Sequence, residues 1–405
     1  AGIEAALAAR QRGYSTLLLE AGEICDSMLR WGHVRLFSAW KLNVSRRGRE
    51  ILAAEGKPLP DGESYVSARE LVSRYFLPLA HSSLLQGCLR SEVRAVSAGR
   101  VNTLKGELIA DARRGENPFR VLWERDGEEG TTDCSILIDA TGVYRTPNAT
   151  GSGGIPAPGE RQVQERILRH LPDPLGRDRG RLTGRRILVV GAGYSAATAV
   201  IDLAALSKEA LQTQVTWAVR SHKRDPVAEI AGDPLPERRE LSRRVNALAA
   251  DLPSGLAVVR GASVVSFVEK PGGLEVTLET EGNTEKIEVD EILSLTGYRP
   301  HPALTQELQI HHCYATEGLM KISAAMLSSG ALLAGGGGDC LKVEPASEET
   351  LVNPEPRLFV IGSKSFGRFS HYLMRSGIEQ VDLIFGSILP RERRQSPSTP
   401  LKSEL

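Results

Sequence analysis

The sequence predicts an α/β fold built from two Rossmann-type nucleotide-binding units, and three observations lead to it. The stretch 185–206 runs from an apolar segment through a glycine pair into an alanine-rich segment. Residues 1–23 combine an alanine-rich helix, a glycine turn, an apolar strand and an acidic residue, which is the second half of such a unit. Two further apolar runs, within 136–148 and 291–300, each end in Thr-Gly, where backbone passes close to a neighbour.

Length and composition limit the class of protein. The chain has 405 residues, 41% hydrophobic and 25% charged, as expected for a globular protein of about two domains. Fifty basic residues balance fifty acidic ones, so net charge favours neither nucleic acid nor an anionic membrane as a partner. No apolar run reaches the length of a membrane span, and no signal-peptide pattern is visible. Five separated cysteines without a CxxC pair indicate reduced thiols and no metal site, so we expect a cytoplasmic protein.

The stretch 185–206 carries the most specific motif. Gly191, Gly193 and Ala196 fit the pattern G-x-G-x-x-G/A between a predicted strand and a predicted helix. The first glycine allows a tight turn, the second lets backbone approach a pyrophosphate, and the third small residue lets the helix pack on the strand. The helix N-terminus then offers N–H groups to phosphate. The loop predicted to bind a dinucleotide comprises Gly191, Gly193, Tyr194, Ser195 and Ala196; the alternative is a purely structural glycine turn.

The end of the next predicted strand suggests which dinucleotide binds. An acidic residue at this position accepts hydrogen bonds from the ribose hydroxyls of NAD or FAD. Here the chain instead has Arg220, Lys223 and Arg224. Such a basic cluster would pair with a 2′-phosphate, which favours NADP(H). The alternative is a solvated basic loop.

The N-terminal stretch lacks the first half of its unit. Glu20 ends the strand after the alanine-rich helix and has the carboxylate expected for an unphosphorylated ribose, as in FAD. Gly2 stands where the third glycine of the fingerprint would be, next to Ala1. We therefore expect that a strand and its glycines precede Ala1 in the intact protein, and that this chain is truncated at its N-terminal end.

Five segments in a fixed order make the chain resemble the two-dinucleotide-binding flavoprotein superfamily, and within it the flavin-containing monooxygenase-like branch of pyridine nucleotide-dependent FAD oxidoreductases. They are Ser64–Ala80, Ser91–Ser97, Ile136–Asn148, Glu291–Pro300 and Pro356–Ile388. The resemblance implies a discontinuous FAD-binding domain, 1–150 and 299–390, with its first strand missing. An NADP-binding domain, 180–298, is inserted in it. The tail 391–405 has the composition of a disordered segment.

The same resemblance implies FAD and NADP(H) as cofactors and assigns residues to them. Those expected to contact FAD are Ala1, Gly2, Glu20, Val93, Thr141, Gly142, Gly362 and Ser363. Those expected to contact NADP(H), beyond the glycine loop and the basic residues, are Thr296 and Gly297. The chain departs from the superfamily at Ser363, where an aspartate usually follows the glycine of the last strand.

No catalytic residue stands out, because a flavin carries the chemistry and the protein orients it. The monooxygenase pattern FxGxxxHxxxY is absent before the second glycine motif, and the lack of CxxC argues against a dithiol mechanism. Trp31, His33 and Arg35 form a stretch rich in reactive side chains and are weak catalytic candidates, with packing and ion pairing as the alternative.

Two functions are compatible with these observations. The leading hypothesis is an FAD-dependent, NADPH-using oxidoreductase, monooxygenase-like, acting on an unidentified small molecule. The alternative is a truncated, catalytically defective relative that keeps a nucleotide-binding scaffold. Neither implies nucleic acid or membrane as a partner, and an oligomer is compatible with both.

Overall fold

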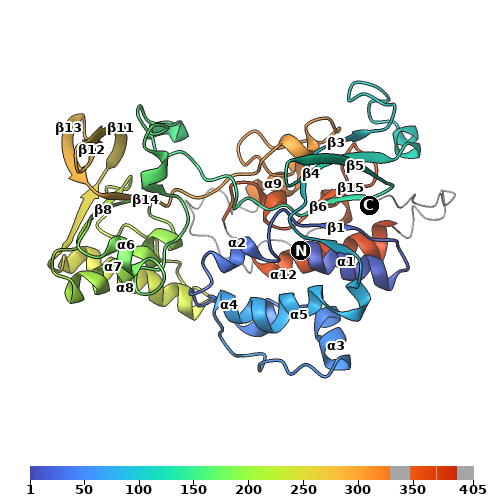
Figure 1. Ribbon diagram of the computed structural model, residues 1–405, viewed down its shortest axis with the longest axis horizontal. Helices are drawn as coiled ribbons and strands as arrows, with labels where there is room; N and C mark the ends of the chain where they lie inside the picture. Colours follow the sequence, from blue (N-terminus) through green and yellow to red (C-terminus); the bar gives the residue numbers. More distant parts are fainter. Residues whose placement is uncertain (329–346, 371, 390–405) are drawn as a thin grey trace. The chain divides into compact units, whose positions relative to one another are not determined.

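The computed structural model describes residues 1–328, 347–370 and 372–389 (Figure 1). The chain divides into two compact units. The first unit comprises Ala1–Leu29, Ser38–Thr146 and Arg299–Leu405, and the second comprises Arg30–Phe37 and Pro147–Tyr298. The predicted disordered tail, 391–405, lies outside the described residues.

A five-stranded parallel sheet forms the centre of the second unit. Its strand order is β10-β9-β8-β14-β7, and all four pairings are parallel. The strands are β7 (Ile167–Leu168), β8 (Arg186–Val190), β9 (Gln214–Val219), β10 (Leu256–Arg260) and β14 (Glu291–Ser294). β8 is an uninterrupted apolar run with Ile187, Leu188 and Val189 almost fully buried, as expected for a strand covered on both faces.

Both faces of this sheet are covered, and the alternation of side chains decides which residues face which layer. Ile187 and Val189 pack into the core made with α7 (Tyr194–Glu209) and α8 (Pro236–Asp251), whereas Leu188 packs into the core of the other face. That second core includes Phe267 and Val276 of a three-stranded antiparallel sheet. Its strands are β11 (Ala262–Lys270), β12 (Gly273–Thr280) and β13 (Asn283–Val289).

The first unit contains two short parallel pairs and an antiparallel sheet. β1 (Leu18–Leu19) pairs with β2 (Leu89–Arg90), and β6 (Leu137–Asp139) pairs with β15 (Leu358–Val360). The antiparallel strands are β3 (Arg94–Arg100), β4 (Phe119–Arg125) and β5 (Glu128–Cys134). Helices α1 (Gly2–Gln11) and α12 (Met374–Leu383) share a core with β15, in which Val381 and Phe359 are buried.

The remaining elements are short. The α-helices are α2 (Asp26–Leu29), α3 (Arg46–Ala54), α4 (Ala68–Leu71), α5 (Leu77–Ala80), α6 (Arg179–Leu182), α9 (Met320–Ser328), α10 (Glu348–Leu351) and α11 (Ser363–Phe366). The π-helical turns are η2 (Val72–Phe76) and η8 (Ile384–Ile388). The 3₁₀ turns are η1 (Trp40–Leu42), η3 (Ser83–Leu85), η4 (Ala112–Glu116), η5 (Ser152–Gly154), η6 (Gln164–Arg166) and η7 (Ala303–Thr305).

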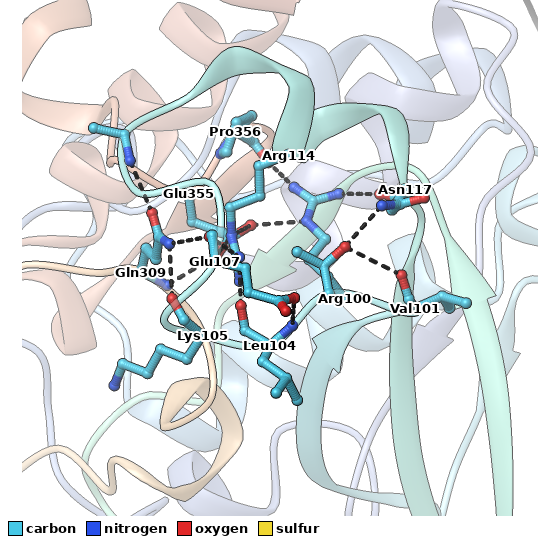
Figure 2. Close-up of polar contacts among 12 residues, drawn as sticks. Arg100, Val101, Leu104, Lys105, Glu107, Arg114, Asn117, Gln309, Glu355 and Pro356 are labelled. Atoms are coloured by element: carbon cyan, nitrogen blue, oxygen red, sulfur yellow. Dashed lines mark hydrogen bonds and ion pairs between the residues drawn. The ribbon is translucent and has the colours of Figure 1, made fainter.

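A buried ionic cluster joins distant segments of the first unit (Figure 2). The Glu355 carboxylate accepts hydrogen bonds from Nε of Arg100 at 2.7 Å and from Nε of Arg114 at 2.8 Å, and all three side chains are fully buried. Arg114 also donates to the carbonyls of Leu104 and Glu107. The loop between β3 and β4 is thereby fixed to the segment that leads into β15.

Candidate nucleotide-binding sites

The carboxyl edge of the five-stranded sheet holds the first predicted site. In parallel sheets ligands bind at this edge, where the strand order reverses direction. β8 is the point of reversal, since β9 lies on one side of it and β14 on the other. Gly191 follows β8 with φ 127°, and a Cβ there would overlap the carbonyl oxygen of Leu295. Only glycine therefore allows this turn.

Gly193 lies in open space, in contrast to the crowded position of Gly191. A Cβ at Gly193 would have no heavy atom within 4 Å, so this part of the loop faces open space. Gly193 is also the N-cap of α7, and no side chain caps that helix end. Uncapped N–H groups at the start of a 16-residue helix are a suitable site for phosphate. Ala196 is fully buried and packs close to the sheet.

The side chain of Tyr194, at the first position of α7, lies between two other groups of the second unit. The Phe37 ring meets it edge-on with centroids 5.4 Å apart, and the Arg238 guanidinium lies 5.9 Å from its ring centroid. Arg238 is in turn held by Asp233 through bonds of 2.8 and 2.6 Å. Ser195 follows Tyr194 and is half-buried. An aromatic side chain and an ion-paired arginine therefore pack against Tyr194 of the glycine loop.

The three basic residues after β9 are exposed. Arg220, Lys223 and Arg224 follow the strand directly, and none of them forms an ion pair within the described ranges. We call the segment 220–224 the basic loop. Its cationic side chains are available to an external phosphate, and their position beside the glycine loop follows from the pairing of β9 with β8.

Thr296 and Gly297 lie at the same edge, after β14. The carbonyl of Gly297 accepts from the Asn148 amide at 2.9 Å, and the carbonyl of Thr296 accepts from Nδ2 of Asn148 at 3.1 Å. Thr296 Oγ1 donates back to the Asn148 carbonyl at 3.2 Å. Several polar groups of these two residues are therefore already hydrogen-bonded to Asn148. Their contact with a nucleotide stays a prediction.

Six of the residues predicted to contact FAD gather in the first unit. A Cβ at Gly362, after β15, would lie 3.2 Å from the Ala1 side chain. A Cβ at Gly2 would lie 3.5 Å from that of Ala140, and one at Gly142 would lie 3.4 Å from Oγ of Ser363. The N-terminus of α1 and the carboxyl ends of β6 and β15 thus meet at one place, which comprises Ala1, Gly2, Thr141, Gly142, Gly362 and Ser363.

A buried ion pair that sequence reasoning missed lies at this place. Lys364 Nζ donates to Oδ2 of Asp139 at 2.6 Å and to Oγ1 of Thr141 at 3.0 Å. Oδ1 of Asp139 accepts from the amide and the hydroxyl of Thr141 at 3.0 and 2.7 Å. The pair ties the ends of β6 and β15 together and fixes the Thr-Gly turn. The only local signal was an aspartate before Ala-Thr-Gly and a lysine after Gly-Ser.

Glu20 and Val93 are joined to each other at the ends of β1 and β2. The Glu20 carbonyl accepts from the Val93 amide at 3.0 Å, so this N–H is already engaged within the protein. The Glu20 carboxylate accepts from the amide of Gly22 at 3.1 Å. Burial raises the pKa of Glu20, against the lowering effect of that hydrogen bond and of Arg145. A partly desolvated carboxylate of this kind gains from hydroxyl donors.

The three weak catalytic candidates belong to the second unit. Trp31 packs against the core formed by α7 and the parallel sheet, and Nη2 of Arg35 lies 3.7 Å from a carboxylate oxygen of Glu237 on α8. His33 is half-buried in the same segment. These contacts are of the packing and ion-pairing kind, and a catalytic role for the three residues stays an untested prediction.

Within 1–328, 347–370 and 372–389, no three His, Cys, Asp or Glu side chains are grouped so as to hold a metal ion. No helix in these ranges is long and apolar enough to cross a membrane.

The fold and the glycine loop define a protein with a Rossmann-type dinucleotide-binding unit. The chain belongs to the pyridine nucleotide-disulphide oxidoreductase family, whose model matches residues 1–319. No curated protein matches the sequence.

Solved structures show the same fold over nearly the whole chain at low identity. A bacillithiol disulfide reductase from Bacillus cereus is 16% identical with a TM-score of 0.67, over 96% of each chain. A cadaverine monooxygenase from Erwinia amylovora is 13% identical with a TM-score of 0.63, over 100% of this chain and 98% of that one. A thioredoxin reductase from T. acidophilum is 14% identical with a TM-score of 0.59, over 96% and 95%.

These matches test the sequence-based expectations. The predicted resemblance to FAD- and pyridine nucleotide-dependent oxidoreductases is confirmed, and so is the predicted α/β fold with two Rossmann-type units. FAD and a nicotinamide dinucleotide, the expected cofactors, are those of this family. The assignment of particular residues to each cofactor stays a prediction.

Proposed function

We propose that the protein is an FAD-dependent oxidoreductase that takes its electrons from NADPH and acts on a small molecule in a monooxygenase-like reaction. One observation carries the choice of NADPH. The basic loop stands at the end of β9, beside the glycine loop, with three cationic side chains that have no ion-pair partner in the described part of the chain. A 2′-phosphate is the group that complements such a cluster.

The second unit fits the dinucleotide on structural grounds. Gly193 leaves open space at the uncapped N-terminus of α7, where the pyrophosphate would lie. Gly191 makes the turn, and Arg220, Lys223 and Arg224 would hold the 2′-phosphate. Each of these roles concerns binding and orientation, which is the protein's share of the chemistry in a cofactor enzyme.

The first unit would hold FAD at the place where α1, β6 and β15 meet. Glu20 would accept from the ribose hydroxyls, and the turn Thr141–Gly142 with Gly362–Ser363 would line the path of the cofactor. Bound FAD would supply the hydride-accepting and electron-transferring chemistry, and these residues would hold and orient it. Lys364 and Asp139 keep this turn in place through their buried bonds.

The described cysteines support a reaction without a protein thiol. Burial raises the pKa of Cys25 and of Cys134 to about 12, so both remain protonated at neutral pH. Cys88 and Cys313 are buried. Burial alone would raise the pKa of Cys313, but hydrogen bonds from Thr316 and Ala315 outweigh this and leave that pKa lowered, so its burial is what withholds this thiol from a partner. Because the thiolate is the reactive form and must be reached by its partner, none of these four suits disulfide reduction. The structural likeness to a cadaverine monooxygenase is compatible with oxygen chemistry.

The decisive experiment measures bound flavin and electron flow on the purified chain. A yellow protein that oxidises NADPH faster than NADH, and consumes oxygen with an amine or another small nucleophilic substrate, would support the proposal. NADPH oxidation that depends on an added disulfide instead of oxygen would contradict the monooxygenase-like assignment. A colourless protein that FAD does not stabilise would contradict the enzyme altogether and favour a nucleotide-binding scaffold.

A further inference from the structure

The basic loop is held by hydrogen bonds from the turn that connects β10 to β11. Val219, the last residue of β9, pairs with Arg260, the last residue of β10. The basic loop begins one residue after Val219, so it leaves the sheet directly beside Arg260 and the following Gly261. Neither of these two residues formed part of any motif in the sequence.

Arg260 holds the far end of the loop through its guanidinium group. Nε and Nη2 donate to the carbonyl oxygen of Arg224 at 3.3 and 3.0 Å, and Nη2 also donates to the carbonyl of Ala249 on α8 at 3.0 Å. One planar side chain therefore connects β10, α8 and the basic loop. The fixed geometry of the guanidinium suits this role, whereas a lysine ammonium could not reproduce the three bonds together.

Gly261 holds the middle of the loop through close backbone contact. Its amide donates to the carbonyl of Ser221 at 3.2 Å, and its φ is 65°. A Cβ at this position would overlap the imidazole ring of His222. The left-handed backbone conformation favours glycine at this position, and an added methyl group would also displace the exposed His222 ring.

We propose that Arg260 and Gly261 are positioning residues that set the preference for the 2′-phosphorylated dinucleotide. This inference rests on the proposed use of NADPH and adds the residues that make the basic loop selective. A flexible loop with three cations would attract any anion weakly, because ordering the loop on binding costs conformational entropy. The bonds from Arg260 to the Arg224 carbonyl and from Gly261 to the Ser221 carbonyl order the loop before a dinucleotide binds, which lowers that cost. Arg260 is not placed in contact with the phosphate itself.

The test measures dissociation constants of NADP⁺ and NAD⁺ by calorimetry on the full chain. Neither measurement requires turnover of a loaded flavin. Binding of NAD⁺ depends on the glycine loop and reports that the second unit is folded in each variant. The ratio of the two constants isolates the contribution of the 2′-phosphate.

Four variants separate position from charge. Arg260→Met removes the bonds and the charge, and Arg260→Lys keeps the charge alone. Gly261→Ala keeps every charge and disturbs the loop through His222 and the backbone. Arg243→Ala is the control, because it removes one cation from α8, where Arg243 pairs with Glu240 and does not contact the loop.

If the proposal is correct, Arg260→Met, Arg260→Lys and Gly261→Ala each weaken the binding of NADP⁺ by about 5- to 30-fold, with little change for NAD⁺. The arginine variants lose the two bonds to the Arg224 carbonyl, and the glycine variant displaces the backbone that bonds Ser221. Arg243→Ala leaves both constants within about twofold.

Two results would overturn the inference. Full retention of the preference in Arg260→Lys together with Gly261→Ala would show that the turn does not position the loop. An equal loss for both dinucleotides would show that the turn only supports the fold of the unit.

The failure of the proposed function gives a different result. Arg220→Ala could selectively weaken the binding of NADP⁺ while the variants at Arg260 and Gly261 do not. In that case the positioning role of the turn is refuted and the proposed use of NADPH stands. If the unmodified chain binds NADP⁺ and NAD⁺ equally, the 2′-phosphate assignment and the inference fail together.

Discussion

The indole Nε1 of Trp217 donates a hydrogen bond of 2.7 Å to the carbonyl oxygen of Gly191, and Trp217 is fully buried. A core side chain on β9 thereby fixes the first glycine of the loop after β8. The bond satisfies the backbone carbonyl of Gly191, directly after the last residue of β8. The geometry of the candidate dinucleotide site therefore depends on the hydrophobic core beneath it.

We expect Trp217→Phe to destabilise the second unit by about 2–4 kcal/mol, from the lost hydrogen bond and the cavity left by the smaller ring. Urea unfolding followed by circular dichroism measures this. Trp123→Phe is the control, because Nε1 of Trp123 has no hydrogen-bond partner among the described residues, so only packing is lost. A smaller loss for Trp217 than for Trp123 would contradict the role of the bond.

Two glycine variants test two separate roles: the tight turn at Gly191 and the close approach of a pyrophosphate at Gly193. Gly191→Ala places a methyl group on the Leu295 carbonyl at φ 127°, so we expect a loss of several kcal/mol or no soluble protein. Gly193→Ala meets open space at φ −83° and should change stability by less than about 1 kcal/mol. It should nevertheless weaken dinucleotide binding, because the methyl group occupies the approach of the pyrophosphate. Unchanged binding in Gly193→Ala would place the pyrophosphate elsewhere.

We expect Arg220→Ala to weaken the binding of NADPH much more than the binding of NADH. The loss of one charge-assisted phosphate contact costs about 1.5–3 kcal/mol of binding free energy. Fluorescence titration of the two reduced dinucleotides gives the comparison directly. Equal losses for both would mean that Arg220 does not meet a 2′-phosphate, and the basic loop would then be a solvated surface segment.

Glu355→Gln tests the buried cluster of the first unit. The substitution keeps the size of the side chain but leaves Arg100 and Arg114 without their anion in a buried place, so we expect a loss of about 3–5 kcal/mol. Glu124→Gln breaks the exposed pair with Arg94 and should cost less than about 1 kcal/mol. Thermal unfolding of the two variants side by side measures the difference. Similar small losses would show that the cluster contributes little.

Glu160 gives the second unit a dependence on acidic pH. Burial alone would raise the pKa of Glu160, but bonds from Arg169, from the amide of Ala157 and from Thr150 outweigh it and leave the pKa lowered. A carboxyl whose pKa is lowered in the folded state stabilises it above the unfolded value, about 4.3, and this contribution is lost as pH falls through the folded pKa.

The matching experiment compares melting temperatures at pH 7 and below pH 4. We expect Glu160→Gln to be less stable than the unmodified chain at pH 7, and the difference to shrink on acidification. Glu285→Gln, on the exposed face of β13, should follow the unmodified chain at both pH values. A constant difference across the pH range would mean that the ionised form of Glu160 does not matter.

The sequence predicted the parts of the structure that local patterns determine. The apolar run of β8, the two glycines and the start of α7 follow from rules that act within about 20 residues. No such rule predicts that residues 30–37 associate with the second unit, because this depends on Trp31 packing against a core formed by residues between Leu171 and Leu295. The bond between Arg100 and Glu355 spans 255 residues, and the pair Asp139–Lys364 spans 225. Ion pairs over such distances leave no periodicity to detect.

The cluster around Glu355 has a consequence for the order in which the protein forms during translation. Residues 147–298 leave the ribosome before Glu355 and β15 are synthesised. The second unit is therefore complete while the loop of Arg100 and Arg114 still has no carboxylate to close on. Because domains generally fold as units during synthesis, we expect the second unit to fold before the first is complete. Until Glu355 is synthesised, Arg100 and Arg114 lack their anion, so we expect the first unit to close only near the end of translation.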